Sequence, residues 1–173
     1  MFIILSYHRS GTHLLASLLN SHPDLTCHDE VLLRPNRHTL AWGNMHLPYK
    51  TLTELGENEG GIVMYQHLKG LPERSMSLIR NSKVIHLVRN DVEELANSII
   101  KVYGRKPSSN EVRRIKKTVA YWRAKALQYS IDNYFSITYE QICNNEAIEE
   151  YRNDNLLKFL GVKPVTLTTN FTK

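Results

Sequence analysis

Cysteine is scarce in this chain of 173 residues, and no apolar stretch approaches the length that crosses a membrane. The two cysteines, Cys27 and Cys143, lie in unlike surroundings, so the pattern does not indicate a disulfide framework and favours a reducing compartment. The apolar start, residues 1–5, lacks the length and the basic leader of a secretion signal. We therefore expect a cytoplasmic protein.

Glycine and proline, with eight and six copies, are too few for a fibrous or low-complexity chain. Hydrophobic residues make up 42% of the sequence, which is typical of a globular protein. We expect a single domain over residues 1–173, with a core large enough to need no metal or disulfide.

Positive charge is the main excess, and it is concentrated in one segment. The net charge is +5, yet residues 101–125 alone hold nine basic residues against a single acid, Glu111. Such a concentration suggests an anionic partner, although a solvated helix face has the same composition.

The order of apolar patterns predicts the fold class. Short, almost continuous apolar runs predict buried strands at residues 2–7, 62–66, 84–88 and 135–139, and a shorter one at 25–27. Helical patterns separate them, so we predict an α/β fold of three layers, in which a central parallel sheet has helices on both faces.

Start and stop signals delimit the predicted helices. One begins after Gly11, a second ends at Gly104, and a long one opens with the capping box formed by Ser108 and Glu111. By contrast, residues 34–61 show no sustained period, and we expect them to form a lid or an acceptor-binding loop.

The strongest chemical signal follows the first predicted strand. The strand runs into Arg9-Ser10-Gly11-Thr12-His13, where a helix begins at once. The first amides of a helix favour an anion, Ser10 and Thr12 add hydroxyl donors, and Arg9 adds a bidentate cation. A simple helix cap would look similar, but the first loop of an α/β sheet is a common ligand site.

This loop is not an ATP-binding P-loop. Thr12 and His13 stand where Lys and Ser/Thr should follow Gly11, and the strand 84–88 leads into Arg89 instead of an aspartate for magnesium. A kinase of the same architecture is therefore a weaker alternative. A nucleotide- or nucleic-acid-binding module without catalysis is another.

Arg9-Ser10-Gly11-Thr12 resembles the 5′-phosphosulfate loop of sulfotransferases that use 3′-phosphoadenosine 5′-phosphosulfate (PAPS). The strand ending in Arg89 and the helix after it resemble the same family's site for the 3′-phosphate. The resemblance covers residues 3–161 and implies a P-loop-like fold, PAPS as donor and PAP as product. We expect no metal, because His22, Cys27 and His28 do not repeat a zinc spacing. The cofactor-binding residues that it implies are Arg9, Ser10, Gly11, Thr12, His13, Arg89, Asn97 and Ser98.

Two positions in the resemblance stay open. The commonest spacing after Arg89 places a serine at position 97, which is Asn97 here, whereas Ser98 fits a variant spacing, and we favour Ser98. The catalytic base is either Glu30, which falls on a glutamate of the tyrosylprotein and glycan branches, or His67, which resembles the histidine of the cytosolic branch. We favour Glu30, with Arg9 stabilising the departing phosphate.

The acceptor is less defined. The resemblance implies a hydroxyl on a small molecule, a glycan or a peptide tyrosine. We expect no membrane partner, because no apolar run is long enough. We do not expect a nucleic-acid partner, because Trp122 and Tyr129 belong to the apolar stripe of the predicted long helix. The chain stops at Lys173, short of the family's basic loop over the nucleotide, and we expect cations of residues 101–125 to replace that loop.

Overall fold

The computed structural model describes residues 1–30, 52–68, 71–102, 104, 106–127, 133–143 and 154–168. Five parallel strands form one sheet in the order β2-β3-β1-β4-β5. The strands are β1 (Phe2–Ser6), β2 (Thr26–Glu30), β3 (Glu59–Met64), β4 (Lys83–Val88) and β5 (Tyr134–Thr138). The helices are α1 (Thr12–Asn20), η1 (Leu52–Glu54), η2 (Tyr65–Leu68), α2 (Glu73–Arg80), α3 (Val92–Lys101), α4 (Ser109–Leu127), α5 (Tyr139–Cys143) and α6 (Asp154–Leu160).

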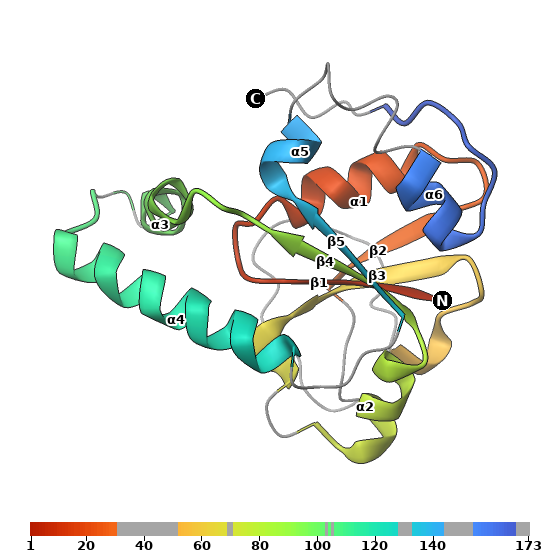
Figure 1. Cartoon of the computed structure of the whole chain (residues 1–173), viewed down its shortest axis with the longest axis horizontal. Helices are drawn as coiled ribbons and strands as arrows, with labels where there is room; N and C mark the ends of the chain where they lie inside the picture. The colour runs from red at the N-terminus through yellow and green to blue at the C-terminus, as the bar shows by residue number, and fades with distance from the viewer. Residues whose placement is uncertain are drawn as a thin grey trace.

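Helices cover both faces of the sheet, so the predicted three-layer α/β fold is confirmed. Figure 1 shows α1, α5 and α6 on one face and α2 and α4 on the other. Successive residues of β1 point to opposite faces. Ile4 packs with Leu15 and Leu19 of α1, and Ile3 packs with Ile79 of α2.

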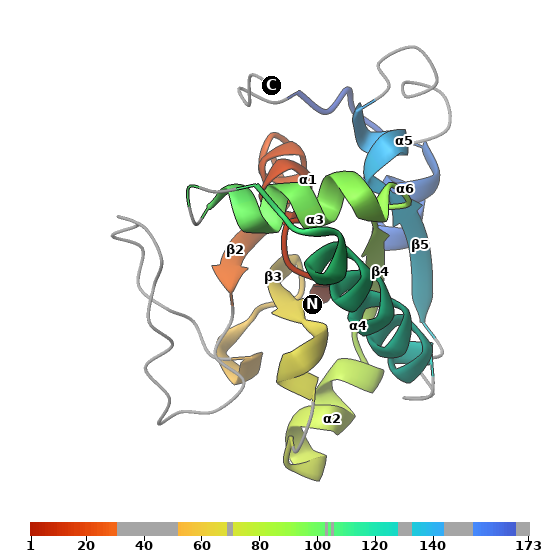
Figure 2. The ribbon, with the colours of Figure 1, turned by 90° about the vertical axis from the view of Figure 1, so that its left-hand side faces the viewer.

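The central position of β1 determines where a ligand site can form. β1 pairs with β3 on one side and with β4 on the other. The chain leaves β1 through α1 on one face and reaches β4 through α2 on the opposite face. Such a reversal of strand order opens a crevice at the carboxyl end of the central strand. Figure 2 looks onto this edge, with α3 and α4 in the foreground.

The predicted strand 62–66 is displaced. β3 begins three residues earlier, at Glu59, inside the predicted loop 34–61, and it ends at Met64, immediately before the 3-10 turn η2. Gly60 lies in this extension, where a Cβ would be 2.2 Å from the Phe2 ring of β1. Only glycine therefore lets the two strands pair beside that ring. An apolar sequence pattern does not count glycine as a strand residue, so the predicted strand begins too late.

The predicted start of α1 after Gly11 and the capping box of α4 are confirmed, whereas α3 ends at Lys101, three residues before the predicted stop at Gly104. In the capping box, the Ser108 amide donates to Glu111 Oε2 at 3.0 Å, and the Glu111 amide donates to Ser108 Oγ at 3.3 Å. Gly104 and Gly161, with φ of 70° and 76°, follow α3 and α6 in the left-handed conformation. Among the described residues, no helix is long and apolar enough to span a membrane.

Candidate functional site

The loop between β1 and α1 has an alternating backbone. Arg9 has φ of 61° and Gly11 has φ of 94°, both left-handed, while Ser10 between them is not. Such alternation turns successive amides toward one side, which creates a concave site for an anion. Ser10 and Thr12 are buried at the start of α1, and the exposed His13 follows them. The φ values of the predicted phosphate loop therefore alternate in the way that is typical of such concave sites.

Tyr139 packs tightly against this loop. A Cβ at Gly11 would lie 2.4 Å from the Tyr139 ring, so glycine is required both by φ and by this contact. Tyr139 also contacts a cation, because the guanidinium carbon of Arg89 lies 4.4 Å from the centroid of the same ring. Tyr139 thus connects the loop after β1 with the residue that ends β4.

Arg89 reaches across the edge of the sheet. Its Nη1 donates to the Arg9 carbonyl at 3.2 Å and its Nη2 donates to Glu94 Oε2 at 2.8 Å. The side chain is only 11% exposed, and its buried Nε has no hydrogen-bond partner among the described residues. A buried guanidinium N–H without an acceptor is costly, and an anionic ligand would satisfy it.

Ser98 and Asn97 lie differently on α3. Arg9 Nε donates to Ser98 Oγ at 3.2 Å, so Ser98 faces the loop after β1. Asn97 is exposed. Adjacent helix positions point about 100° apart, so the two side chains cannot both face the loop.

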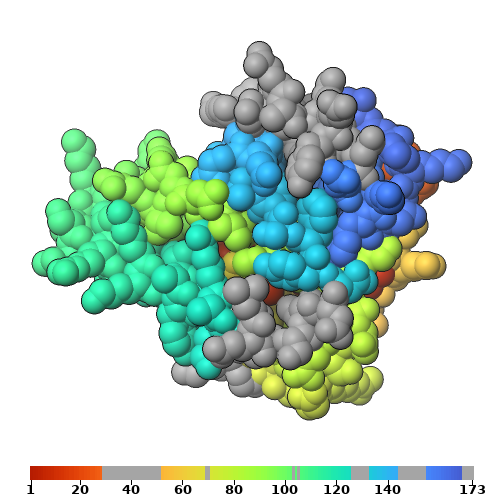
Figure 3. Space-filling view, in the orientation of Figure 1, coloured from red at the N-terminus to blue at the C-terminus, as the bar shows by residue number. Residues whose placement is uncertain are grey.

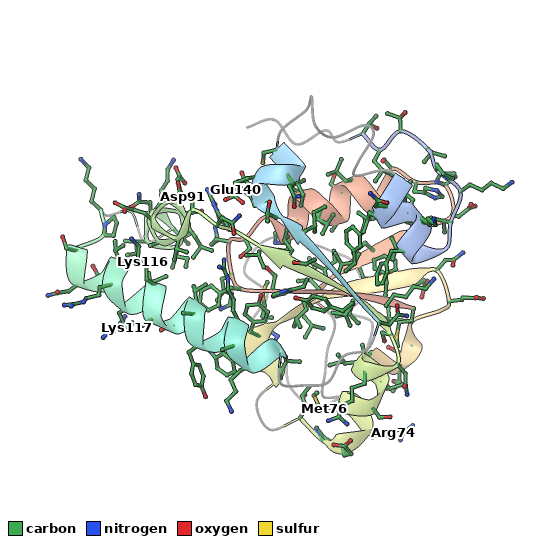
Figure 4. The ribbon with its side chains drawn as sticks, viewed as in Figure 1. Arg74, Met76, Asp91, Lys116, Lys117 and Glu140 are labelled. Atoms are coloured by element: carbon green, nitrogen blue, oxygen red, sulfur yellow. The ribbon has the colours of Figure 1, made fainter. Side chains whose placement is uncertain are left out.

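Glu140 anchors the start of α3. Its carboxylate accepts hydrogen bonds from the Asn90 amide at 3.0 Å and the Asp91 amide at 3.1 Å. Figure 4 shows Asp91 and Glu140 side by side. Partial burial acts to raise the pKa of Glu140, but these amides and the charge of Arg89 outweigh it, so the pKa is lowered. The Tyr139-Glu140 pair therefore positions Arg89 and α3 together.

Histidines gather on the other side of β1. His8 follows the strand, and its Nε2 is hydrogen-bonded to the side-chain nitrogen of Gln66 in η2. The surrounding protein lowers the pKa of His8 by desolvation, and the neighbouring His67 lowers it further. The predicted catalytic residue His67 therefore lies near a second histidine that the sequence analysis did not single out, although it stands beside Arg9.

Glu30 is the last residue of β2, where the structure describes its backbone only. It is in register with Ile62 of β3, and a bulge between His28 and Glu30 shifts the pairing. Such bulges redirect side chains at the ends of strands. The two candidate bases thus belong to the carboxyl ends of neighbouring strands, Glu30 as the last residue of β2 and His67 in η2 directly after β3.

A buried polar cluster under α4 was also missed. His86 of β4 is hydrogen-bonded through both ring nitrogens to phenols, Tyr65 at Nε2 and Tyr134 at Nδ1. Burial, assisted by the charge of Arg123, lowers the pKa of His86 to about 4. Tyr65 immediately precedes Gln66 and His67, so the cluster holds η2 on the sheet. His86 looks like an ordinary strand residue in the sequence.

The sequence predicts no metal site. Within the described residues, no group of three or more His, Cys, Asp or Glu side chains is placed to hold a metal ion.

Comparison with solved structures identifies the fold. The chain superposes on a sulfotransferase from Alicyclobacillus acidocaldarius with a TM-score of 0.62 at 17% identity, covering 99% of this chain and 85% of that one. A sulfotransferase domain from the curacin biosynthetic pathway gives 0.60 at 19% identity, covering 94% and 74%. A mouse sulfotransferase complexed with PAP gives 0.53 at 18% identity, covering 95% and 59%. Neither protein-family models nor curated protein sequences give a match.

Proposed function

Starting from a chain that has the fold of sulfotransferase structures, we propose that it transfers the sulfonate group of PAPS to a hydroxyl acceptor. The donor would supply an activated sulfonate on a phosphate leaving group. The chain would supply two anion positions at one edge of the sheet, together with a base.

One observation carries the proposal. Arg9 and Arg89 are 80 residues apart in sequence, yet Arg89 donates to the Arg9 carbonyl and Arg9 donates to Ser98. The alternating loop beside Arg9 suits one phosphate, and the unpartnered Nε of Arg89 suits another. A nucleotide with anionic groups at both its 5′ and 3′ ends fits this pair of positions, and the mouse structure with PAP bound has the same fold.

The residues would act mainly by positioning and by charge. The amides at the start of α1 and the Arg9 guanidinium would bind the 5′ group and stabilise charge on the departing phosphate oxygen. Arg89 and Ser98 would hold the 3′-phosphate, Ser98 being favoured over the exposed Asn97. Ser10, Thr12 and His13 line the same helix start.

The base completes the reaction. The acceptor oxygen forms a bond to sulfur as the bond from sulfur to the phosphate oxygen breaks, and the hydroxyl proton goes to Glu30 or His67. We favour Glu30. The parallel pairing of β2 with β3 is compatible with this choice, because it puts the end of β2 at the same edge of the sheet as Arg9.

Thermal unfolding with PAP in the absence of metal, compared with ATP and magnesium, tests the donor. A ligand at 100 times its dissociation constant adds ~2.7 kcal/mol, which corresponds to a rise in Tm of roughly 5–11 °C. We expect a rise with PAP that Arg89→Ala abolishes, with Arg80→Ala, an exchange of an arginine on α2, as the matched control. A rise with magnesium-ATP alone would support a kinase instead, and no rise with either ligand would support a module without catalysis.

A further inference from the structure

Arg89, the residue that follows β4, lies beyond the hydrogen-bonded ladders of the sheet. β4 pairs with β1 up to Leu87 and with β5 up to Val88, so Arg89 stands one residue past both pairings. Backbone groups that are withdrawn from water need hydrogen-bond partners wherever they lie. The position of the Arg89 backbone therefore depends on side chains from other elements.

Glu140 and Arg123 hold this segment from opposite faces of the sheet. The Glu140 carboxylate, in α5, accepts hydrogen bonds from the amides of Asn90 and Asp91 at 3.0 and 3.1 Å. From α4, Arg123 Nη2 donates to the Arg89 carbonyl. Because α5 and α4 lie on opposite faces of the sheet (Figure 1), the two contacts fix the backbone around Arg89 from both directions.

Arg123 belongs to the cationic segment 101–125, but its charge is used differently from that of its neighbour Lys116. Lys116 lies 3.5 Å from Glu93 of α3 and forms an ion pair with it. In the part of the chain that the structure describes, no carboxylate forms an ion pair with Arg123. Its side chain is half-buried. The charge of Arg123 therefore lies beside the end of β4 and adds to the positive charge of the donor site.

α4 provides a firm base for this contact. Val119, one turn before Arg123, is 1% exposed, and Trp122 packs on the hydrophobic core. α3, which carries Ser98, packs against α4, and Figure 3 shows the two helices side by side at one side of the molecule. Arg123 thus connects a helix that is anchored in the core with the backbone of Arg89.

Three arginines form a continuous series of contacts across the site. Arg123 donates to the Arg89 carbonyl, and Arg89 Nη1 donates to the Arg9 carbonyl at 3.2 Å. Arg9 Nε in turn donates to Ser98 Oγ at 3.2 Å. In the first two steps the guanidinium group of one arginine holds the backbone of the next. A shift of the Arg89 backbone would therefore displace both its own side chain and the loop that contains Arg9.

We propose that Arg123 is a positioning residue of the donor site, which keeps Arg89 oriented toward the 3′-phosphate. This inference rests on the proposed function. Arg123 acts through the Arg89 carbonyl, so that the buried, unpartnered Nε of Arg89 stays where an anion can meet it. A guanidinium suits this role because it keeps its charge at any physiological pH and offers several donors in a fixed plane.

Calorimetric titration with PAP tests the role. Arg123→Met keeps the apolar stem but removes every donor, and it should weaken PAP binding about tenfold. Arg123→Lys keeps a charge and a donor and should restore most of the affinity, leaving a loss of about threefold. The loss in Arg123→Met should persist at high salt, because salt screens distant charges and does not correct a displaced side chain.

Two matched controls lie on the same helix. Val119→Ala opens a cavity and should lower the Tm without touching the Arg89 carbonyl. Arg113→Met removes an exposed positive charge. Both variants should bind PAP within about twofold of the wild-type protein.

The Nε–H signals of arginine in a proton–nitrogen NMR spectrum give a readout that needs no nucleotide. The signal of Arg89 is assigned by its absence in Arg89→Lys. It should shift or broaden in Arg123→Met and stay unchanged in Val119→Ala and Arg113→Met. Should Arg123→Met fail to fold, Arg123→Lys carries the same test, with a smaller shift and the smaller loss of affinity expected.

Unchanged PAP affinity and an unchanged Arg89 signal in the Arg123 variants would overturn the positioning role. An equal loss of affinity in Val119→Ala would also overturn it, because affinity would then follow stability alone. An equal loss in Arg113→Met that disappears at high salt would reduce Arg123 to one of several distant charges. If the wild-type protein does not bind PAP while the Arg89 signal still depends on Arg123, the proposed function is rejected and the positioning of Arg89 by Arg123 is supported.

Discussion

The two sides of β1 form two halves of the proposed site that differ in their chemistry. The donor half, toward β4, consists of Arg9, Arg89, Ser98 and Tyr139, joined to one another by direct contacts. The acceptor half, toward β3 and β2, contains His8, Gln66 and the two candidate bases.

Charge behaves differently in the two halves. Arginines and backbone amides keep their charge and polarity across the physiological pH range, whereas histidines change theirs. On the proposed function, donor binding would therefore depend little on pH, and proton transfer would follow the base. We expect turnover to vary little between about pH 6 and 8 if Glu30 is the base, whereas a strong fall in turnover toward pH 6 would assign the base to a histidine.

The largest effect is expected from a substitution in the acceptor half alone. Glu30→Gln should lower turnover roughly 100- to 10,000-fold, because the proton of the acceptor hydroxyl loses its base. PAP affinity, measured by calorimetry, should not change. His67→Gln is the matched variant, and near-normal turnover in Glu30→Gln with a large loss in His67→Gln would assign the base to His67.

The next largest effect is expected from a substitution that disturbs the backbone of the donor half. Gly11→Ala places a methyl group at φ of 94° and 2.4 Å from the Tyr139 ring. We expect a loss of roughly 2–4 kcal/mol in the free energy of unfolding, together with weaker PAP binding. Gly104→Ala is the control, since its φ of 70° is similar but no atom lies within 4 Å. It should lose only about 1 kcal/mol. Equal losses in the two variants would contradict the role of the Tyr139 contact.

A third prediction concerns the buried polar cluster of His86, Tyr65 and Tyr134. The pKa of His86 is lowered to about 4 by burial and then by Arg123, so the unfolded chain binds a proton that the folded protein does not. The stability present above the unfolded pKa of about 6.5 should fall by roughly 2–3 kcal/mol as the pH drops toward 4. Urea unfolding at several pH values should show a flatter dependence in His86→Gln. An unchanged slope would show that other groups dominate acid sensitivity.

The smallest effect is expected from a substitution that increases donor affinity. Glu94 holds Arg89 Nη2 at 2.8 Å in the structure, although the glutamate side chain is 60% exposed. If Arg89 binds the 3′-phosphate, this carboxylate competes with it. Glu94→Gln should therefore raise PAP affinity roughly two- to fivefold, the size of an exposed ion pair. Glu93→Gln, one residue away and paired with Lys116, should have no effect.

Parts of the site were predictable because they are local. The loop after β1 and the capping box depend on a few neighbouring residues, and their patterns predicted them. Tyr139 was expected to end a strand, but it begins α5 and packs between Gly11 and Arg89. No short pattern contains that information, since the three residues lie far apart along the chain.

The sequence by itself determined an α/β fold, the loop with Arg9 before the first helix and a cluster of cations between residues 101 and 125, because periodicity, loop chemistry and charge are properties of short segments. Only the tertiary structure decided that Arg89 reaches Arg9, that Ser98 rather than Asn97 faces the loop, and that His86 is buried between two tyrosines. The reason is that parallel pairing of β1 with β3 and β4 brings distant segments to one edge, and that pairing depends on the whole sheet.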